Sequence, residues 1–234
     1  MKARILTLLI LSCALIAVGC GQNSRNDGRR DRETYVRVYN SVTDLDSIDI
    51  AVGGSLYFSG IGYLEQTGYF KVDTVDESLE VTSSDSFITL YEREGGFDDR
   101  SDQSLFVYGK ADDRRALFVK DDNETPGSNL SKLRIINLST ANRRGIDVYV
   151  ALSDTSTRPA SPSAESLGTG VASRYLTSSS GQYDIVITSI DSDTPLTTLS
   201  KQLLDSKKVY TLVISDSPGG ELPLRVALLE DSKS

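Results

Sequence analysis

Closely spaced carboxylates are the residues of this chain that most resemble catalytic groups. They occur as pairs at three places: Asp44-x-Asp46, Asp98-Asp99 and Asp112-Asp113. A pair of carboxylates can act as acid and nucleophile in glycoside hydrolysis. All three pairs stand in turn-like stretches, however, where Asp is common because its side chain hydrogen-bonds to nearby backbone. We therefore interpret them as solvated turn residues.

The acids also raise the question of a calcium site, since carboxylate oxygens are ligands that calcium prefers. Two groups could supply several oxygens from one loop: Asp44, Asp46 and Asp49, and Asp98, Asp99 and Asp102. Neither has the spacing of an EF-hand, which places a Gly in the middle of the loop and a Glu at its end. We expect no bound metal and no cofactor.

The chain lacks the side chains that most other catalytic mechanisms require. The chain contains no His, which excludes Ser-His-Asp triads, His-ligated zinc and an imidazole general base. It also contains no phosphate-binding loop, dinucleotide fingerprint or nucleophile elbow. Ser200-Lys201 and Ser206-Lys207 are sequence neighbours, and on a strand their side chains would face opposite ways. We predict that the protein is not an enzyme.

A short unit of sequence occurs twice and organises the rest of the chain. Val36-Arg-Val-Tyr-Asn40 is followed by Ile48-Asp-Ile-Ala-Val52, and Leu133-Arg-Ile-Ile-Asn137 is followed by Ile146-Asp-Val-Tyr-Val150. In both copies an apolar strand with one Arg ends at Asn, a polar turn follows, and a second strand opens with Ile-Asp. Such self-similarity indicates one structural unit used twice.

Strand alternation predicts which of these side chains are buried. Val36 and Val38 share one face of their strand, and Ile48, Ile50 and Val52 form the next inward set. The second copy repeats both sets with Leu133, Ile135, Ile146, Val148 and Val150. The charged residues are left outward: Arg37 and Asp49, and Arg134 and Asp147. If the two strands are neighbours, each Arg faces its Asp as a surface pair worth about 0.2–1 kcal/mol.

The remaining pattern predicts an all-β protein with two tandem immunoglobulin-like β-sandwich domains after a lipoprotein signal peptide. We assign the domains to residues 34–121 and 131–234, with a polar linker at 122–130 that contains Pro126-Gly127. Further strands are expected at Tyr69–Val72, Ser78–Val81, Phe87–Tyr91, Leu105–Tyr108, Ala116–Val119, Tyr183–Ile187, Val209–Ile214 and Leu224–Leu229. Val209–Ile214 should be central in its sheet. Ser153–Thr169 is expected to be a loop, and Ser200–Lys207 a turn or two of helix.

The N-terminus has the features of a secretion signal. Lys2 and Arg4 precede the apolar run Ile5–Val18, which predicts a signal peptide over residues 1–19. The run ends in Gly19-Cys20 and resembles a bacterial lipoprotein box, which implies that Cys20 receives a lipid. The alternative is a plain secretory signal cut after Gly19. If Cys20 carries a lipid, residues 20–33 tether the fold to a membrane. We expect the outer membrane, because Gly21 follows the Cys and an Asp at that position would favour the inner membrane.

Net charge narrows the range of partners. The formal charge is −8, and removal of the signal would make it −10. Phosphates of nucleic acids and anionic lipid heads repel such a chain. We therefore expect no nucleic acid partner. The membrane contact would be made through the lipid on Cys20, and the partner would be an unknown envelope protein or polysaccharide.

The repeated unit resembles a bacterial family, the domain of unknown function 4397 (DUF4397). Val36-Arg37-Val38-Tyr39-Asn40 and Ile146-Asp147-Val148-Tyr149-Val150 are the best matches to its motifs, and Tyr210-Thr211-Leu212-Val213 resembles its last strand. The first unit departs from the family at Leu105-Phe106-Val107-Tyr108, where Tyr-Thr is usual. The resemblance implies a secreted or lipid-anchored β-sandwich and no settled activity.

Aromatic residues are distributed unevenly between the two units. Of the seventeen Tyr and Phe residues, thirteen lie between Tyr35 and Phe118. A first core filled with rings would explain the surplus, since cores tolerate such exchanges. The alternative is an exposed interaction surface, because Tyr is enriched at recognition sites. Our candidates for that surface are Tyr57, Tyr63 and Tyr69, which lie around Gly-containing turns.

These observations predict a lipid-anchored envelope protein that acts as a non-catalytic binding or structural module. The alternative is a surface lipoprotein that binds or hydrolyses carbohydrate. The absence of Trp counts against the alternative, because sugar sites use flat aromatic rings.

Overall fold

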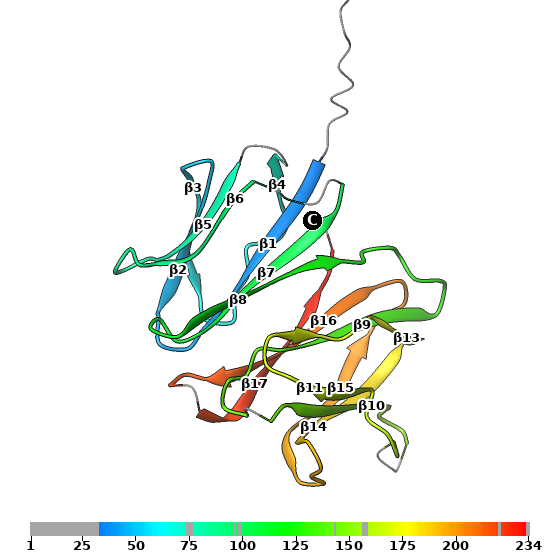
Figure 1. The fold of residues 1–234 in the computed structure, drawn as a ribbon. Coiled ribbons are helices and arrows are strands. Elements are labelled where there is room, and N and C mark those ends of the chain that lie inside the picture. The colour runs from blue at the N-terminus through cyan, green and yellow to red at the C-terminus, as the bar shows by residue number, and fades with distance from the viewer. Residues whose placement is uncertain are drawn as a thin grey trace, which may run out of the picture. The chain divides into compact units, whose positions relative to one another are not determined.

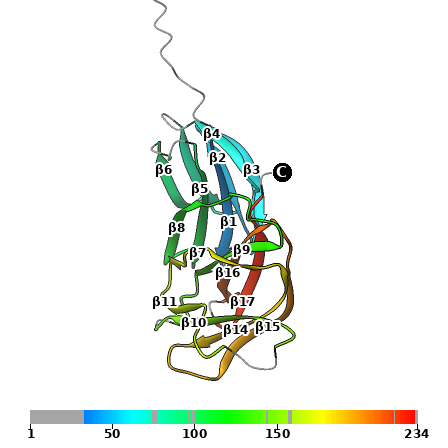
Figure 2. The same ribbon diagram turned by 90° about the vertical axis from the view of Figure 1, so that its right-hand side faces the viewer.

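The computed structural model describes residues 33–73, 77–95, 97, 100–142, 144–155, 159–219 and 221–232. Throughout these ranges the regular elements are β-strands, so the predicted all-β fold is confirmed (Figures 1 and 2). A search of the same ranges finds no helix long and apolar enough to cross a membrane. The predicted signal peptide and Cys20 lie outside the described residues.

In the described residues, eight strands form the first sandwich. They are β1 (Glu33–Val42), β2 (Ser47–Val52), β3 (Ser55–Gly62), β4 (Phe70–Asp73), β5 (Ser78–Ser83), β6 (Thr89–Glu94), β7 (Asp102–Gly109) and β8 (Arg114–Asp121). One sheet has the order β4-β1-β7-β8 and the other β3-β2-β5-β6. β1 runs parallel to β7, and the other pairs are antiparallel.

The second sandwich contains nine strands over the part of the chain that the structure describes. They are β9 (Leu130–Asn137), β10 (Ile146–Leu152), β11 (Ala164–Leu167), β12 (Val171–Ala172), β13 (Leu176–Ser179), β14 (Gly181–Ser189), β15 (Pro195–Leu204), β16 (Val209–Ser217) and β17 (Glu221–Glu230). The sheets have the orders β12-β9-β16-β17, with β13 also on β9, and β11-β10-β14-β15. β9 runs parallel to β16, as β1 does to β7. The repeat in the sequence is therefore a repeat in topology.

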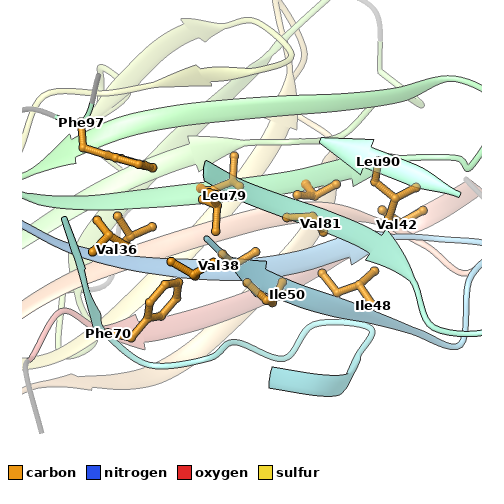
Figure 3. Packing of buried hydrophobic residues seen from close by; sticks show 14 residues of the cluster. Val36, Val38, Val42, Ile48, Ile50, Phe70, Leu79, Val81, Leu90 and Phe97 are labelled. Carbon is orange, nitrogen blue, oxygen red and sulfur yellow. The ribbon is translucent and has the colours of Figure 1, made fainter. Parts of the chain in front are cut away.

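Each sandwich has its own apolar core, built as alternation predicts. Val36 and Val38 on β1 pack against Ile48 and Ile50 on β2 and Leu79 on β5 (Figure 3). The equivalent positions on β9 and β10 fill the second core. Burying such side chains is the main favourable contribution to folding. The strands of the first sandwich end at Asp121, whereas the domain limits 34–121 and 131–234 stay a prediction.

The predicted pairing of Arg37 with Asp49 is wrong, as is that of Arg134 with Asp147. β1 and β2 belong to different sheets, and so do β9 and β10. An Arg on one sheet therefore cannot face an Asp across neighbouring strands. Strand alternation correctly predicted that each Arg points away from its own core. The prediction that β1 pairs with β2, and β9 with β10, was the mistaken step.

Two segments were also misassigned. Ser200–Lys207 was expected to be helical, but β15 continues to Leu204. The register of β15 shifts opposite Asp184, and Lys201 there has a φ of 56°. This bulge interrupts the alternation that marks a strand. Ser153–Thr169, expected to be a loop, contains the short strand β11. The central position predicted for Val209–Ile214 is confirmed, because β16 lies between β9 and β17.

Candidate functional site

The two sandwiches meet through the outer faces of the sheets that contain β1 and β9. Tyr39 and Phe106 of the first sandwich pack in one buried cluster with Ile136 and Val213 of the second. The ring centroids of Tyr39 and Phe106 are 5.7 Å apart. Tyr39 points to this face because its neighbour Val38 points into the first core. Both faces of the β1 sheet are therefore buried.

Arg37 lies at this interface and is almost fully buried. Its Nη2 donates to Asp231 Oδ1 at 2.5 Å, which makes an ion pair with the end of the second sandwich. Its Nε donates to Ser104 Oγ at 2.7 Å, and the guanidinium carbon lies 4.9 Å from the ring centre of Tyr69. The charge thus has a carboxylate, a hydroxyl and an aromatic face around it.

Arg134 repeats the arrangement from the other side. Its Nη2 donates to Asp121 Oδ1 at 2.6 Å and to Thr211 Oγ1 at 3.0 Å. Its guanidinium carbon lies 4.8 Å from the ring centre of Tyr175. Each Arg therefore pairs with the Asp at the end of the last strand of the other sandwich.

Two hydroxyls close these contacts into a ring. Ser104 Oγ donates to Asp121 Oδ2 at 2.6 Å, and Thr211 Oγ1 donates to Asp231 Oδ2 at 2.7 Å. The result is a closed circuit of six side chains, here called the polar ring: Arg37, Ser104, Asp121, Arg134, Thr211 and Asp231. Each sandwich contributes one Arg, one hydroxyl and one Asp, and a pseudo-twofold relation exchanges the two sets.

Two tyrosines complete the polar ring from its rim. Tyr69 donates its hydroxyl to Asp121 Oδ2 at 2.7 Å, and Tyr175 donates to Asp231 Oδ2 at 3.0 Å. Burial raises the pKa of both phenols, so they remain protonated donors at neutral pH. Burial opposes the charge of Arg37, but Asp231 raises the net pKa of this guanidinium. In the ring, both arginines and both Asp carboxylates thus have hydrogen-bond partners.

The repeated Asp residues have a local structural role. Asp49 Oδ1 accepts from the backbone N–H of Gly60 at 2.9 Å, and Asp147 Oδ1 accepts from that of Ser166 at 2.7 Å. Gly60 and Ser166 have φ values of 70° and 51°, and each interrupts the neighbouring edge strand. The Ile-Asp pair of the repeat therefore fixes the irregular edge strand beside it.

The repeated Asn residues have matching partners as well. The side-chain amide of Asn40 donates to the carbonyl of Ile61, and that of Asn137 donates to the carbonyl of Leu167. Each also accepts from the backbone N–H two residues further along its own chain. The Asn thus links the end of the first strand to the edge strand of the opposite sheet. These contacts account for every polar position that the two copies share.

A groove of about 910 Å³ lies where loops of both sandwiches meet. Lys110, Asp112 and Asp113 line it from the turn between β7 and β8, and Arg115 adds a second cation. Thr140 and Thr169 line it from the second sandwich.

Hydrogen bonds hold the walls of this groove in place. The turn is closed by the bond from Asp113 N to Lys110 O at 3.1 Å, and Asp44 Oδ1 accepts from Ala111 N at 2.8 Å. Thr140 is held from behind by Asp216 Oδ2, which accepts its backbone N–H at 2.8 Å and its hydroxyl at 2.7 Å. The hydroxyl of Thr169 donates to the Ser139 carbonyl. Both hydroxyl oxygens keep a lone pair that can accept from a ligand.

The chemistry of the groove is that of polar recognition. Lys110 and Arg115 donate hydrogen bonds, whereas Asp112, Asp113 and the two Thr oxygens accept them. Arg115 Nη2 donates to Asp113 Oδ2 at 3.1 Å, in a pair whose side chains are 47% and 68% exposed. Such a groove suits a ligand with many donors and acceptors, and the described lining residues include no nucleophile paired with a general base.

The three tyrosines of the predicted interaction surface lie in different surroundings. Tyr63 donates its hydroxyl to the backbone carbonyl of Asp216, and Tyr69 belongs to the rim of the polar ring. Burial raises the pKa of Tyr63 to about 12. Tyr57, in contrast, is 50% exposed on β3, where the register with β2 shifts. The structure thus brings Tyr63 to the second sandwich and Tyr69 to the rim of the polar ring, and it leaves Tyr57 at the surface. An interaction role for the three stays a prediction.

Sequence reasoning missed the polar ring and the groove. Within the ring, the arginines carried the clearest signal, since Arg37 and Arg134 repeat at the same place in their strands, and Thr211 lay in the stretch that resembles the family's last strand. Asp121 and Asp231 follow strands of different sequence and were not singled out. Of the proposed calcium ligands, Asp44 and Asp49 accept backbone N–H groups, and Asp98 and Asp99 lie outside the described residues. Over the part of the chain described, no three acids, His or Cys cluster as metal ligands would.

Comparison with known proteins identifies one family. The model described as "Domain of unknown function (DUF4397)" matches residues 34–149, which cover the first sandwich, β9 and the first part of β10. No curated protein matches the chain.

Two solved structures share part of the chain trace. A family CBM26 module from Eubacterium rectale Amy13K, solved with maltoheptaose, is 10% identical with a TM-score of 0.27, covering 86% of this chain and 98% of its own. A protein from Bacteroides ovatus described as a "putative adhesin" is 10% identical with a TM-score of 0.26, covering 86% and 93%. With TM-scores this low, neither likeness carries an argument about function.

Proposed function

Because residues 34–149 of this chain belong to the DUF4397 family, we propose that the protein is a lipid-anchored cell-envelope protein whose paired sandwiches form a non-catalytic binding module. The anchor is proposed from the sequence: a basic start, the apolar run Ile5–Val18 and then Cys20. The binding role is supported by the groove that both sandwiches line. The non-catalytic role is supported by the polar ring, because the repeated arginines have a structural role there and join the two sandwiches.

The groove favours a hydroxyl-rich or zwitterionic ligand. Its volume falls within the range of small-molecule sites, about 300–1,000 Å³. Its lining combines donors and acceptors, which suits the hydroxyl groups of a saccharide. The described lining contains no aromatic platform, so each sugar unit would bind weakly, and a polysaccharide would gain affinity through several contacts. Carbohydrate hydrolysis is the weaker alternative, because no specific feature of the groove favours it.

The anchor is tested by Cys20→Ala. The diacylglyceryl group attached through the thiol would supply most of the membrane affinity. The variant should therefore move from the membrane fraction to the soluble fraction when cells are fractionated. Retention of the Ala variant in membranes would remove the lipoprotein part of the proposal.

The binding role is tested with the soluble Cys20→Ala chain on an array of envelope polysaccharides, followed by calorimetry on any saccharide retained. The added change Lys110→Ala with Arg115→Ala should weaken that binding at least tenfold and leave the melting temperature nearly unchanged, because both side chains are exposed. Lys71→Ala, an exposed cation on β4 outside the described lining, is the matched control. Equal binding by all three chains would show that the groove is not the site, and absence of any saccharide binding would exclude this class of ligand.

A further inference from the structure

The polar ring consists of two equal halves. The first sandwich supplies Arg37, Ser104 and Asp121, and the second supplies Arg134, Thr211 and Asp231. Within each half the hydroxyl already bridges to the Asp, at 2.6 Å in the first and 2.7 Å in the second. The two ion pairs, at 2.5 and 2.6 Å, are the bonds that cross between the halves. An interface that uses the same groups on both sides is self-complementary.

The apolar part of the interface has the same character. Tyr39 and Phe106 stand on β1 and β7, and Ile136 and Val213 stand on the equivalent strands β9 and β16. Carbonyls repeat the relation: Arg134 Nη1 donates to Lys120 O at 3.1 Å, and Arg37 Nη1 lies 3.5 Å from Glu230 O. In both cases the carbonyl belongs to the residue before the paired Asp.

We propose that this face recognises a second copy of the chain, with the first sandwich of one copy bound to the second sandwich of another. The contacts of the polar ring and of the apolar cluster are made again in such an exchanged dimer, because they join the sandwiches directly. The connection itself adds the pair of Asp122 with Lys132, which stays within one copy. That connection is short and polar. It runs from the end of β8 at Asp121 to the start of β9 at Leu130.

The buried charges are the reason that the face must be occupied. Opening the chain would separate Arg37 from Asp231 and Arg134 from Asp121. It would also expose the apolar cluster to water. Exchange restores both, at the cost of joining two molecules. In dilute solution the connection keeps the two sandwiches at high effective concentration, so the closed chain dominates. The exchanged dimer should therefore form when the closed interface is blocked or when chains are crowded.

Two single variants allow a decisive test in the full chain. Arg37→Asp places two carboxylates opposite each other in the closed form, and Asp231→Arg places two guanidinium groups opposite each other. Neither variant can satisfy its pairs alone or with another copy of itself. Mixed, they can: the carboxylate introduced at position 37 of one copy meets the guanidinium introduced at position 231 of the other, and the native Arg37 meets the native Asp231. We expect a one-to-one heterodimer in native mass spectrometry, at least tenfold above either homodimer.

The matched control is the chain that carries both changes. Here the reversed pair is satisfied internally, so this variant should stay monomeric in the same measurement. Two folded single variants that remain monomers after mixing would overturn the proposal. If either single variant is unfolded alone, refolding of the unchanged chain from urea at rising concentration decides the question. A dimer whose fraction grows with concentration supports exchange, and a monomer at every concentration overturns it.

Discussion

Two guanidinium groups are withdrawn from water in this protein, and each is compensated by one carboxylate from the other sandwich. Removing a charge from water costs several kcal/mol, and the cost is recovered only when a partner and further hydrogen bonds surround it. The polar ring meets this condition for Arg37 and Arg134. The polar ring therefore contributes mainly to the specificity of the interface. The two sandwiches can pair only in the register that gives both Arg37 and Arg134 a carboxylate partner.

Replacement of Arg37 by Met tests this at the level of one residue. Met has a similar length and leaves Asp231 buried with only the longer ion-pair contact to Arg134, at 3.8 Å, which should lower the free energy of unfolding by about 3–5 kcal/mol. Arg115→Met is the matched control, because the pair of Arg115 with Asp113 is exposed and should change stability by no more than about 1 kcal/mol. Both values come from urea unfolding followed by circular dichroism. Equal small losses for the two variants would mean that the buried pair does not constrain the fold.

Among the elements, β7 ends in a residue on which the groove depends. Gly109 has a φ of 93°, and a Cβ there would lie 2.5 Å from the carbonyl oxygen of Asp113. That carbonyl belongs to the turn that carries Lys110 and Asp113 into the groove. Only a residue without a side chain allows the turn to close so tightly.

Gly109→Ala should therefore cost more than the backbone conformation alone. The left-handed φ costs about 1 kcal/mol for a residue with a Cβ, and the clash adds to this. Gly54→Ala is the control: it shares a left-handed φ, of 74°, but its Cβ would meet no atom within 4 Å. Thermal unfolding should show a clearly larger loss for the Gly109 variant. If the two glycines prove equivalent, the turn is more adaptable than its geometry implies.

Strands with clean alternation were predictable, and strands with bulges were not. Val36–Asn40 and Ile48–Val52 alternate regularly, so their inward faces were assigned correctly. β3 went unpredicted because its register shifts around Tyr57 and Gly60, which interrupts the alternation, and β15 was mistaken for a helical turn for the same reason. Each of these bulges has a backbone N–H that donates to the side chain of an Asp on the neighbouring strand. A local pattern does not contain that partner.

For the whole molecule, the repeat was enough to predict two sandwiches of one topology, but not the faces that join them. Arg37 and Asp231 are 194 positions apart, and no local feature of either residue points to the other. Alternation shows that Arg37 faces away from its own core, and this is equally true of a solvated side chain. The groove was not predicted for a similar reason, since it arises where loops of the two sandwiches meet.

Cleavage of the connection tests most directly the claim that the two sandwiches form one body through the polar ring. A protease site placed between Glu124 and Thr125 divides the chain without touching the ring. The two pieces should run separately on a denaturing gel. In size-exclusion chromatography with light scattering, we expect them to elute together at the mass of the uncut chain. We also expect that adding Arg37→Asp releases them. Two folded pieces that elute separately after cleavage of the unchanged chain would contradict the account.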